Sequence, residues 1–206
     1  MQRKKKSNNR EALPRLYLEY ELIDGNGRLL RKGRRRRANS FVGNIVALLF
    51  CITSYSTTTY VSQAGYPSAI RDRTGALRDI HMASAITAAA SYGTHTYGIR
   101  VGTGTTAVAI DQYNLASPIT HGTAAGQLLY ADTLVEPITR GSTEWLFRII
   151  RSFSNSTDST ITVNEVGLFL NISGGYFAML ARDLTGGIPV PSGATITFRY
   201  IISHSV

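Results

Sequence analysis

Cysteine is nearly absent from this 206-residue chain, which has only Cys51. A disulfide within the chain is therefore excluded, and a zinc site built on cysteine pairs is not expected. The four histidines do not compensate, because none lies at metal-ligand spacing from another His, a Cys or an acid; they are His81, His95, His121 and His204. We therefore expect neither a metal nor another cofactor.

Catalytic signatures are also scarce. Residues 102–107 (GTGTTA) match the G-x-G-x-x-A pattern of dinucleotide-binding turns. That pattern requires a following helix and an acid about 20 residues later. Here Pro118 follows soon after, and no acid lies between Asp111 and Asp132. We expect these glycines to form a tight turn between strands, and the protein not to be an enzyme.

No apolar run is long enough to span a membrane. The longest, residues 41–52 (FVGNIVALLFCI), contains Asn44, whereas a spanning helix needs about 20 apolar residues. We predict instead a buried helix over residues 40–53, capped by Asn39 or Ser40. It is apolar nearly all round, so its own sheet or another subunit should cover it. The predicted assembly residues are Phe41, Ile45, Leu48, Leu49 and Ile52.

Positive charge is confined to the start of the chain. Residues 1–37 contain 13 Lys/Arg and 4 Asp/Glu, whereas residues 38–206 contain 9 of each. We predict a basic arm with a hairpin over residues 1–37 and a body over residues 38–206. The arm would contact nucleic acid, a membrane surface or an acidic protein, or act as a solubilising tail. The candidate contacts are Arg3, Lys4, Lys5, Lys6, Arg34, Arg35, Arg36 and Arg37.

The four consecutive arginines, residues 34–37, cannot share one face of a regular element. We therefore expect them to radiate from a loop or from the start of the helix, where they could bind several phosphates at once. Upstream, Arg15–Leu22 alternates apolar and polar residues, a turn follows, and a second run begins at Arg28. This pattern predicts a hairpin at a sheet edge or on a partner surface.

The last third has the clearest strand pattern. Three successive antiparallel strands are predicted, at Thr160–Leu168, Gly175–Leu184 and Val190–Ser203, and the rest of the chain would add strands to their sheet. In the last strand one face is apolar: Ala194, Ile196, Phe198, Tyr200 and Ile202. Further strands are expected at Thr96–Val101, Gln127–Pro137 and Thr143–Phe153, and a small hairpin at Ala69–His81. The predicted fold is mainly β, an antiparallel β-sandwich with one or two short helices.

A family resemblance spans residues 95–203. The order of its turn and strand motifs is similar to that of small virion proteins of tailed bacteriophages. The motifs are G-I-x-V-G-T-G-T-T-A from Gly98, D-x-Y-x-L from Asp111, H-G-T from His121, R-x-F-x-N-x-[ST] from Arg151, T-V-x-E-V-G-L from Thr162, A-R-D from Ala181 and V-P-x-G-x-T-I-T-x-x-Y from Val190.

This resemblance implies a structural component that assembles into symmetric rings or lattices in the head, neck, tail or baseplate. Its partners would be copies of itself and other virion proteins, and it would be located in the virion after assembly in the host cytoplasm. The alternative is a nucleic-acid-binding capsid or packaging protein that uses the basic arm. A hydrolase of surface glycans is a third hypothesis, but the paired carboxylates that it needs are not recognisable.

Overall fold

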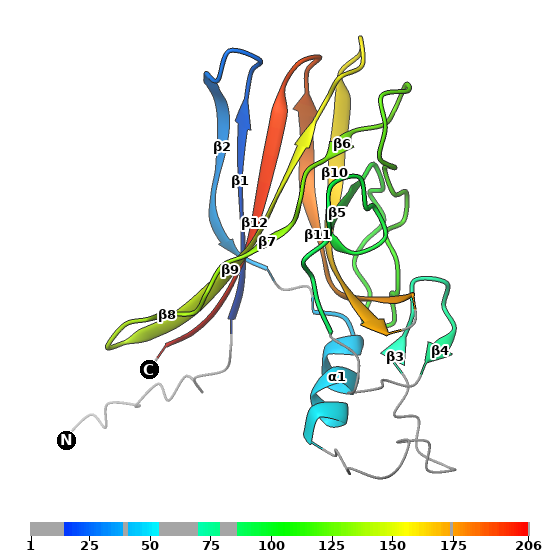
Figure 1. Ribbon diagram of the computed structural model, residues 1–206, viewed down its shortest axis with the longest axis vertical. Helices are drawn as coiled ribbons and strands as arrows, with labels where there is room; N and C mark the ends of the chain where they lie inside the picture. Colours follow the sequence, from blue (N-terminus) through cyan, green and yellow to red (C-terminus); the bar gives the residue numbers. More distant parts are fainter. Residues whose placement is uncertain (1–14, 39–40, 54–69, 79–85, 174, 206) are drawn as a thin grey trace, which may run out of the picture.

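The computed structural model describes residues 15–38, 41–53, 70–78, 86–173 and 175–205. Within them the protein is mainly β, with antiparallel sheets and one short helix, as the sequence predicted. Two sheets pack against each other around a shared apolar core (Figure 1). The first cationic cluster, residues 3–6, lies outside the described residues.

The larger sheet has the strand order β2-β1-β12-β9-β6, and β7 and β8 also pair with β9. All its described pairings are antiparallel. Its strands are β1 (Arg15–Ile23), β2 (Leu29–Arg37), β6 (Leu129–Tyr130), β7 (Leu134–Val135), β8 (Thr139–Arg140), β9 (Glu144–Ser154) and β12 (Thr195–Ser205).

The smaller sheet has the order β11-β10-β5, again antiparallel. Its strands are β5 (Gly98–Gly102), β10 (Ile161–Ser173) and β11 (Tyr176–Val190). The predicted small hairpin is confirmed as β3 (Ile70–Arg71) and β4 (Leu77–Arg78). Its turn is closed by the Asp72 carboxylate, which accepts hydrogen bonds from the backbone N–H groups of Thr74 and Ala76.

The last strand confirms the predicted face but corrects its sheet. Ile196, Phe198 and Tyr200 are fully buried, because they point from β12 toward the smaller sheet. However, β12 does not continue the β10–β11 pair; it crosses to the larger sheet and lies between β1 and β9. An alternating pattern fixes which residues face the core, but not which neighbour a strand pairs with.

The predicted helix begins later than residue 40. Phe41 forms a β-bridge with Ala181, Val42 N–H donates to Leu180 O at 2.9 Å, and the helix α1 spans Asn44–Thr53. Residues 41 and 42 thus bond to β11 instead of starting a helix, so the predicted cap at residues 39–40 is wrong. Figure 1 shows α1 below the smaller sheet.

The basic hairpin belongs to the body. β1 pairs with β12 along nine residues, so the expected boundary at residue 37 falls inside the packing of the larger sheet. We predicted that the four arginines lie in a loop or at a helix start. They instead form the end of β2, the outermost strand of the larger sheet. An edge strand tolerates such charge because only one of its sides is paired.

Candidate functional site

An apolar groove of about 670 Å³ opens where the two sheets separate beside α1. Its walls contain no ionisable side chain and come from both sheets, from the helix and from the loop before β5. We call this region the open end; its lining residues are Phe41, Ile45, Leu49, Ile86, Thr87, Ala88, Ala89, Val135, Phe147, Ile149, Leu168, Leu170, Leu180 and Ile202. Such a surface favours contact with another apolar surface over contact with water.

The inner face of β9 shows how the groove arises. Alternate residues share a face of a strand, and along this row the exposed fraction rises from 0% at Phe153 through 4% at Ile149 to 53% at Trp145. In Figure 1, β8 and the adjoining ends of β9 and β12 bend away from α1 and the smaller sheet. The larger sheet therefore extends beyond its partner and leaves the end of its inner face uncovered in the described structure.

The helix wall of the groove is held by one polar side chain. Asn44 donates from Nδ2 to Arg71 O at 2.8 Å and to Met179 O at 3.0 Å, while its Oδ1 accepts from Arg71 N at 2.9 Å. These three bonds fix the start of α1 to β3 and β11. They orient the helix so that Leu48 is buried in the core, whereas Val46 is 67% exposed.

The predicted assembly residues divide into three groups. Phe41, Ile45 and Leu49 line the groove, but Leu48 packs in the subunit's own core. The backbone of Ile52 belongs to α1, and its side chain lies outside the described residues. The sequence predicted a strand at Thr143–Phe153 but did not assign its residues, or those of the other strands, to this surface.

A loop covers the outer face of the smaller sheet through a buried ion pair. Glu165 and Arg182 are both fully buried, with Arg182 Nε 2.6 Å from Glu165 Oε2. The carboxylate also accepts backbone N–H groups from residues 104, 116 and 117 at 2.8–3.1 Å. A side chain at Gly102 or Gly104 would collide with Glu165. These glycines therefore allow close approach to a carboxylate and do not form the tight turn that we predicted.

Arg151 fastens other parts of the same loop region to β9. Its five N–H donors all bond to main-chain carbonyls at 2.6–3.3 Å: those of Ala131, Tyr97, Ile99, Ser91 and Thr94. Burial lowers the pKa of Arg151 to about 10, so the group stays charged at neutral pH. Residues 91–131 lie on one side of the sandwich in Figure 1. Because Arg151, Glu165 and Arg182 hold them there, we call this region the loop-covered side.

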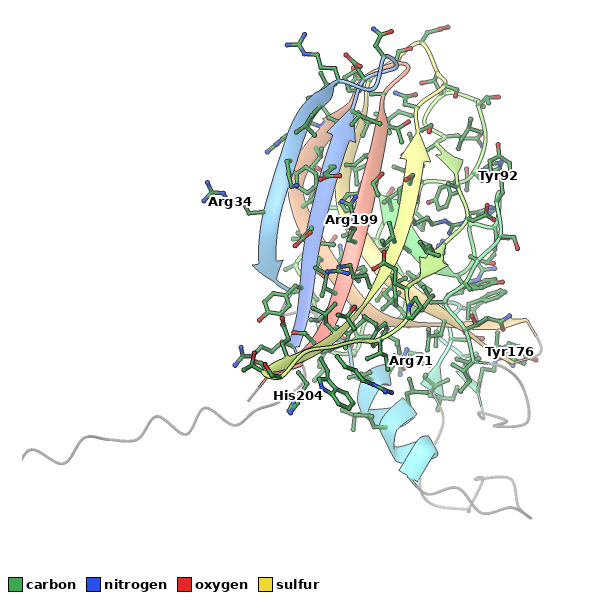
Figure 2. The ribbon with its side chains drawn as sticks, turned by 60° about the vertical axis from the view of Figure 1, so that its left-hand side comes forward. Arg34, Arg71, Tyr92, Tyr176, Arg199 and His204 are labelled. Atoms are coloured by element: carbon green, nitrogen blue, oxygen red, sulfur yellow. The ribbon has the colours of Figure 1, made fainter. Side chains whose placement is uncertain are left out.

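The second predicted site is the basic strand β2. Arg34 is exposed and points away from the sheet in Figure 2. Residues 35, 36 and 37 continue β2 and are described through their backbone alone, paired with β1 near Tyr17 and Leu18. The structure thus brings the groove residues together at one end of the molecule and places the arginines along one edge.

The described residues contain neither a metal cluster nor a membrane-spanning helix. Among the described residues, no group of three or more His, Cys, Asp or Glu could hold a metal ion. In the same part of the chain, no helix combines the length and apolar character needed to cross a membrane. Comparison of the chain with protein-family models, curated proteins and solved structures found no match.

Proposed function

We propose that this chain is a non-enzymatic structural subunit of a phage particle, which assembles by burying its open end against a second copy of itself. The observation that carries the proposal is the groove, since its lining is apolar and has no ionisable group. Removing such a surface from water contributes about 25 cal/mol per Å² of apolar area. The motif order of residues 95–203 supports the phage assignment.

A second copy is the favoured occupant because the open end has apolar projections beside its recess. Val46 projects from α1, and Ile138 and Trp145 project near β8 and β9, each more than half exposed. In a two-fold contact the same patch meets itself, so the projections of one copy can enter the groove of the other. Obligate interfaces of this kind bury about 2,000 Å² or more.

The test is the oligomeric state of the full chain, measured by light scattering after size exclusion. We expect the wild type to self-associate, and to do so at least as strongly in high salt, because apolar contacts are not screened. The double variant Val135→Gln, Trp145→Gln places polar groups in and beside the groove. It should shift the chain toward monomer by at least tenfold in dissociation constant.

A matched control removes side chains elsewhere that are at least as exposed as Val135 and Trp145. Leu77 and Tyr92 are 56% and 61% exposed and do not line the groove. The double variant Leu77→Gln, Tyr92→Gln should keep the wild-type oligomer. A wild-type chain that stays monomeric at its highest soluble concentration, or a control that dissociates as much as the groove variant, would contradict the proposal.

A further inference from the structure

The outer edge of β2 is a second interaction surface, separate from the groove. In the described structure β2 hydrogen-bonds only to β1, so the backbone groups on its other side are unpaired. Neighbouring residues of a strand point to opposite faces. Leu30, Arg31 and Lys32 are all exposed, and so is Arg34. The strand is therefore accessible on both faces as well as along its edge.

This accessible strand has an unbalanced charge. Residues 28–37 contain seven Lys/Arg and no acid, and the whole hairpin, residues 15–37, contains eight cationic and three acidic side chains. Glu21 forms ion pairs with two cations at once: its carboxylate lies 2.8 Å from Lys32 Nζ and 2.9 Å from an Arg199 nitrogen. The Asp24 carboxylate accepts backbone N–H groups of the turn. The three acids of the hairpin thus leave it with a net charge of +5.

The register of the hairpin concentrates the charge further. Leu18 pairs with Arg36 and Tyr20 with Gly33, so residues 34 and 35 together lie opposite Glu19 alone. This is a β-bulge, in which two residues of one strand oppose one of the other. The backbone of two consecutive arginines thus lies opposite that of a single acid, in the stretch where cations are densest. Like charges this close repel one another, so an anionic partner would stabilise the edge.

We infer that β2 binds the phosphate backbone of a single-stranded nucleic acid. A phosphate is matched by the planar fork of arginine, which supplies six of the seven cations. Accessibility on both faces favours a flexible strand over an acidic protein surface or a duplex, because either of the latter would meet only one face. The phosphate contacts would position the nucleic acid without reading its sequence.

The test is fluorescence anisotropy of a labelled 30-nucleotide single strand titrated with the full chain at several salt concentrations. Each phosphate neutralised contributes about 0.7 to the slope of log K against log salt for single strands. The quadruple variant Arg34→Gln, Arg35→Gln, Arg36→Gln, Arg37→Gln should therefore lower the slope by about 2 to 3. We expect its affinity at low salt to fall at least tenfold.

Two controls separate this edge from net charge and from folding. The quadruple Arg→Lys variant keeps the charge, so its slope should match the wild type even though the bidentate contacts are lost. The variant Arg71→Gln, Arg73→Gln, Arg140→Gln, Arg148→Gln loses the same net charge elsewhere and should keep most of the affinity.

Three results would overturn the inference: a wild-type slope below about 1.5, an equal loss in the remote control, or equally strong competition by a poly-glutamate of the same length. The first does not depend on whether the Gln variant folds. Groove association is measured separately and strengthens rather than weakens in salt, so either proposal can fail without the other.

Discussion

The inner face of β9 is buried at the loop-covered side and exposed at the open end. On the inner face of β9, Phe153 and Arg151 are enclosed, whereas Trp145, on the same face and farther along the strand, is 53% exposed. The composition of the row does not explain the difference, because the exposed end is more apolar than the enclosed one, which contains Arg151. The difference lies in what covers each part: residues 91–131 on one side, and nothing among the described residues on the other.

The loop-covered side also shows what self-covering requires. A loop has backbone groups that must be hydrogen-bonded when they are buried. Here Glu165 supplies the acceptor and Arg151 the donors, each satisfying several main-chain groups at once. The open end has no such side chains, so a covering surface there must satisfy its own polar groups. A folded apolar surface, such as that of a second subunit, meets this condition.

The largest expected effect is at Arg151. In Arg151→Met, five carbonyls lose their donor, and an unsatisfied buried polar group costs about 1–3 kcal/mol. We expect a loss of at least about 5 kcal/mol, close to the whole stability of many domains, so the loops should open even if the sheets persist. Urea unfolding followed by circular dichroism measures the loss.

The control for this variant is Arg148→Met on the same strand. Arg148 is partly exposed and forms an ion pair with Glu136 at 3.1 Å, so its removal should cost at most about 1 kcal/mol. Arg151→Lys, which keeps the charge but has only three donors, should lie between the two. Equal stabilities of Arg151→Met and Arg148→Met would show that the carbonyls do not depend on Arg151.

The next largest effect is at the buried ion pair. Glu165→Gln leaves the Arg182 guanidinium buried without a carboxylate, which typically costs about 3–5 kcal/mol. The double variant Glu165→Gln, Arg182→Met removes the uncompensated charge. It should recover about half of that loss, measured by the same unfolding experiment. A double variant less stable than Glu165→Gln alone would mean that Arg182 acts mainly through its contacts to Ala107 and Gln112.

The sequence predicted the parts of this comparison that depend on local pattern. Alternation identified the core face of β12, and turn residues identified the hairpins at residues 15–37 and 70–78. The sequence-based prediction failed where contacts with residues distant in the chain determine the local structure. The apolar run at residues 41–52 suggested a helix from its first residue, but hydrogen bonds to β11 hold residues 41 and 42 outside the helix.

The groove shows the same limit. Phe41, Ile45 and Leu49 could be proposed from one apolar segment, whereas Val135, Phe147 and Ile202 join them only through the register of the larger sheet. Glu165 had no signal of its own, since a single acid in a strand usually faces water. Its role in holding the loop depends on the close approach of Gly102 and Gly104, which belong to the segment that matched a nucleotide-binding pattern.

The smallest effect expected is at Asn44, the polar anchor of the open end. Asn44→Ala breaks three hydrogen bonds to β3 and β11 and should cost about 1–3 kcal/mol, less than either change on the loop-covered side. Asn164→Ala, which removes one exposed bond to Thr103 O, is the matched control and should cost about 0.5 kcal/mol. Because α1 forms one wall of the groove, Asn44→Ala should also weaken self-association, whereas Asn164→Ala should not. If Asn44→Ala lowers stability but leaves association intact, the helix is not part of the contact, and the interface must lie on the strands of the larger sheet alone.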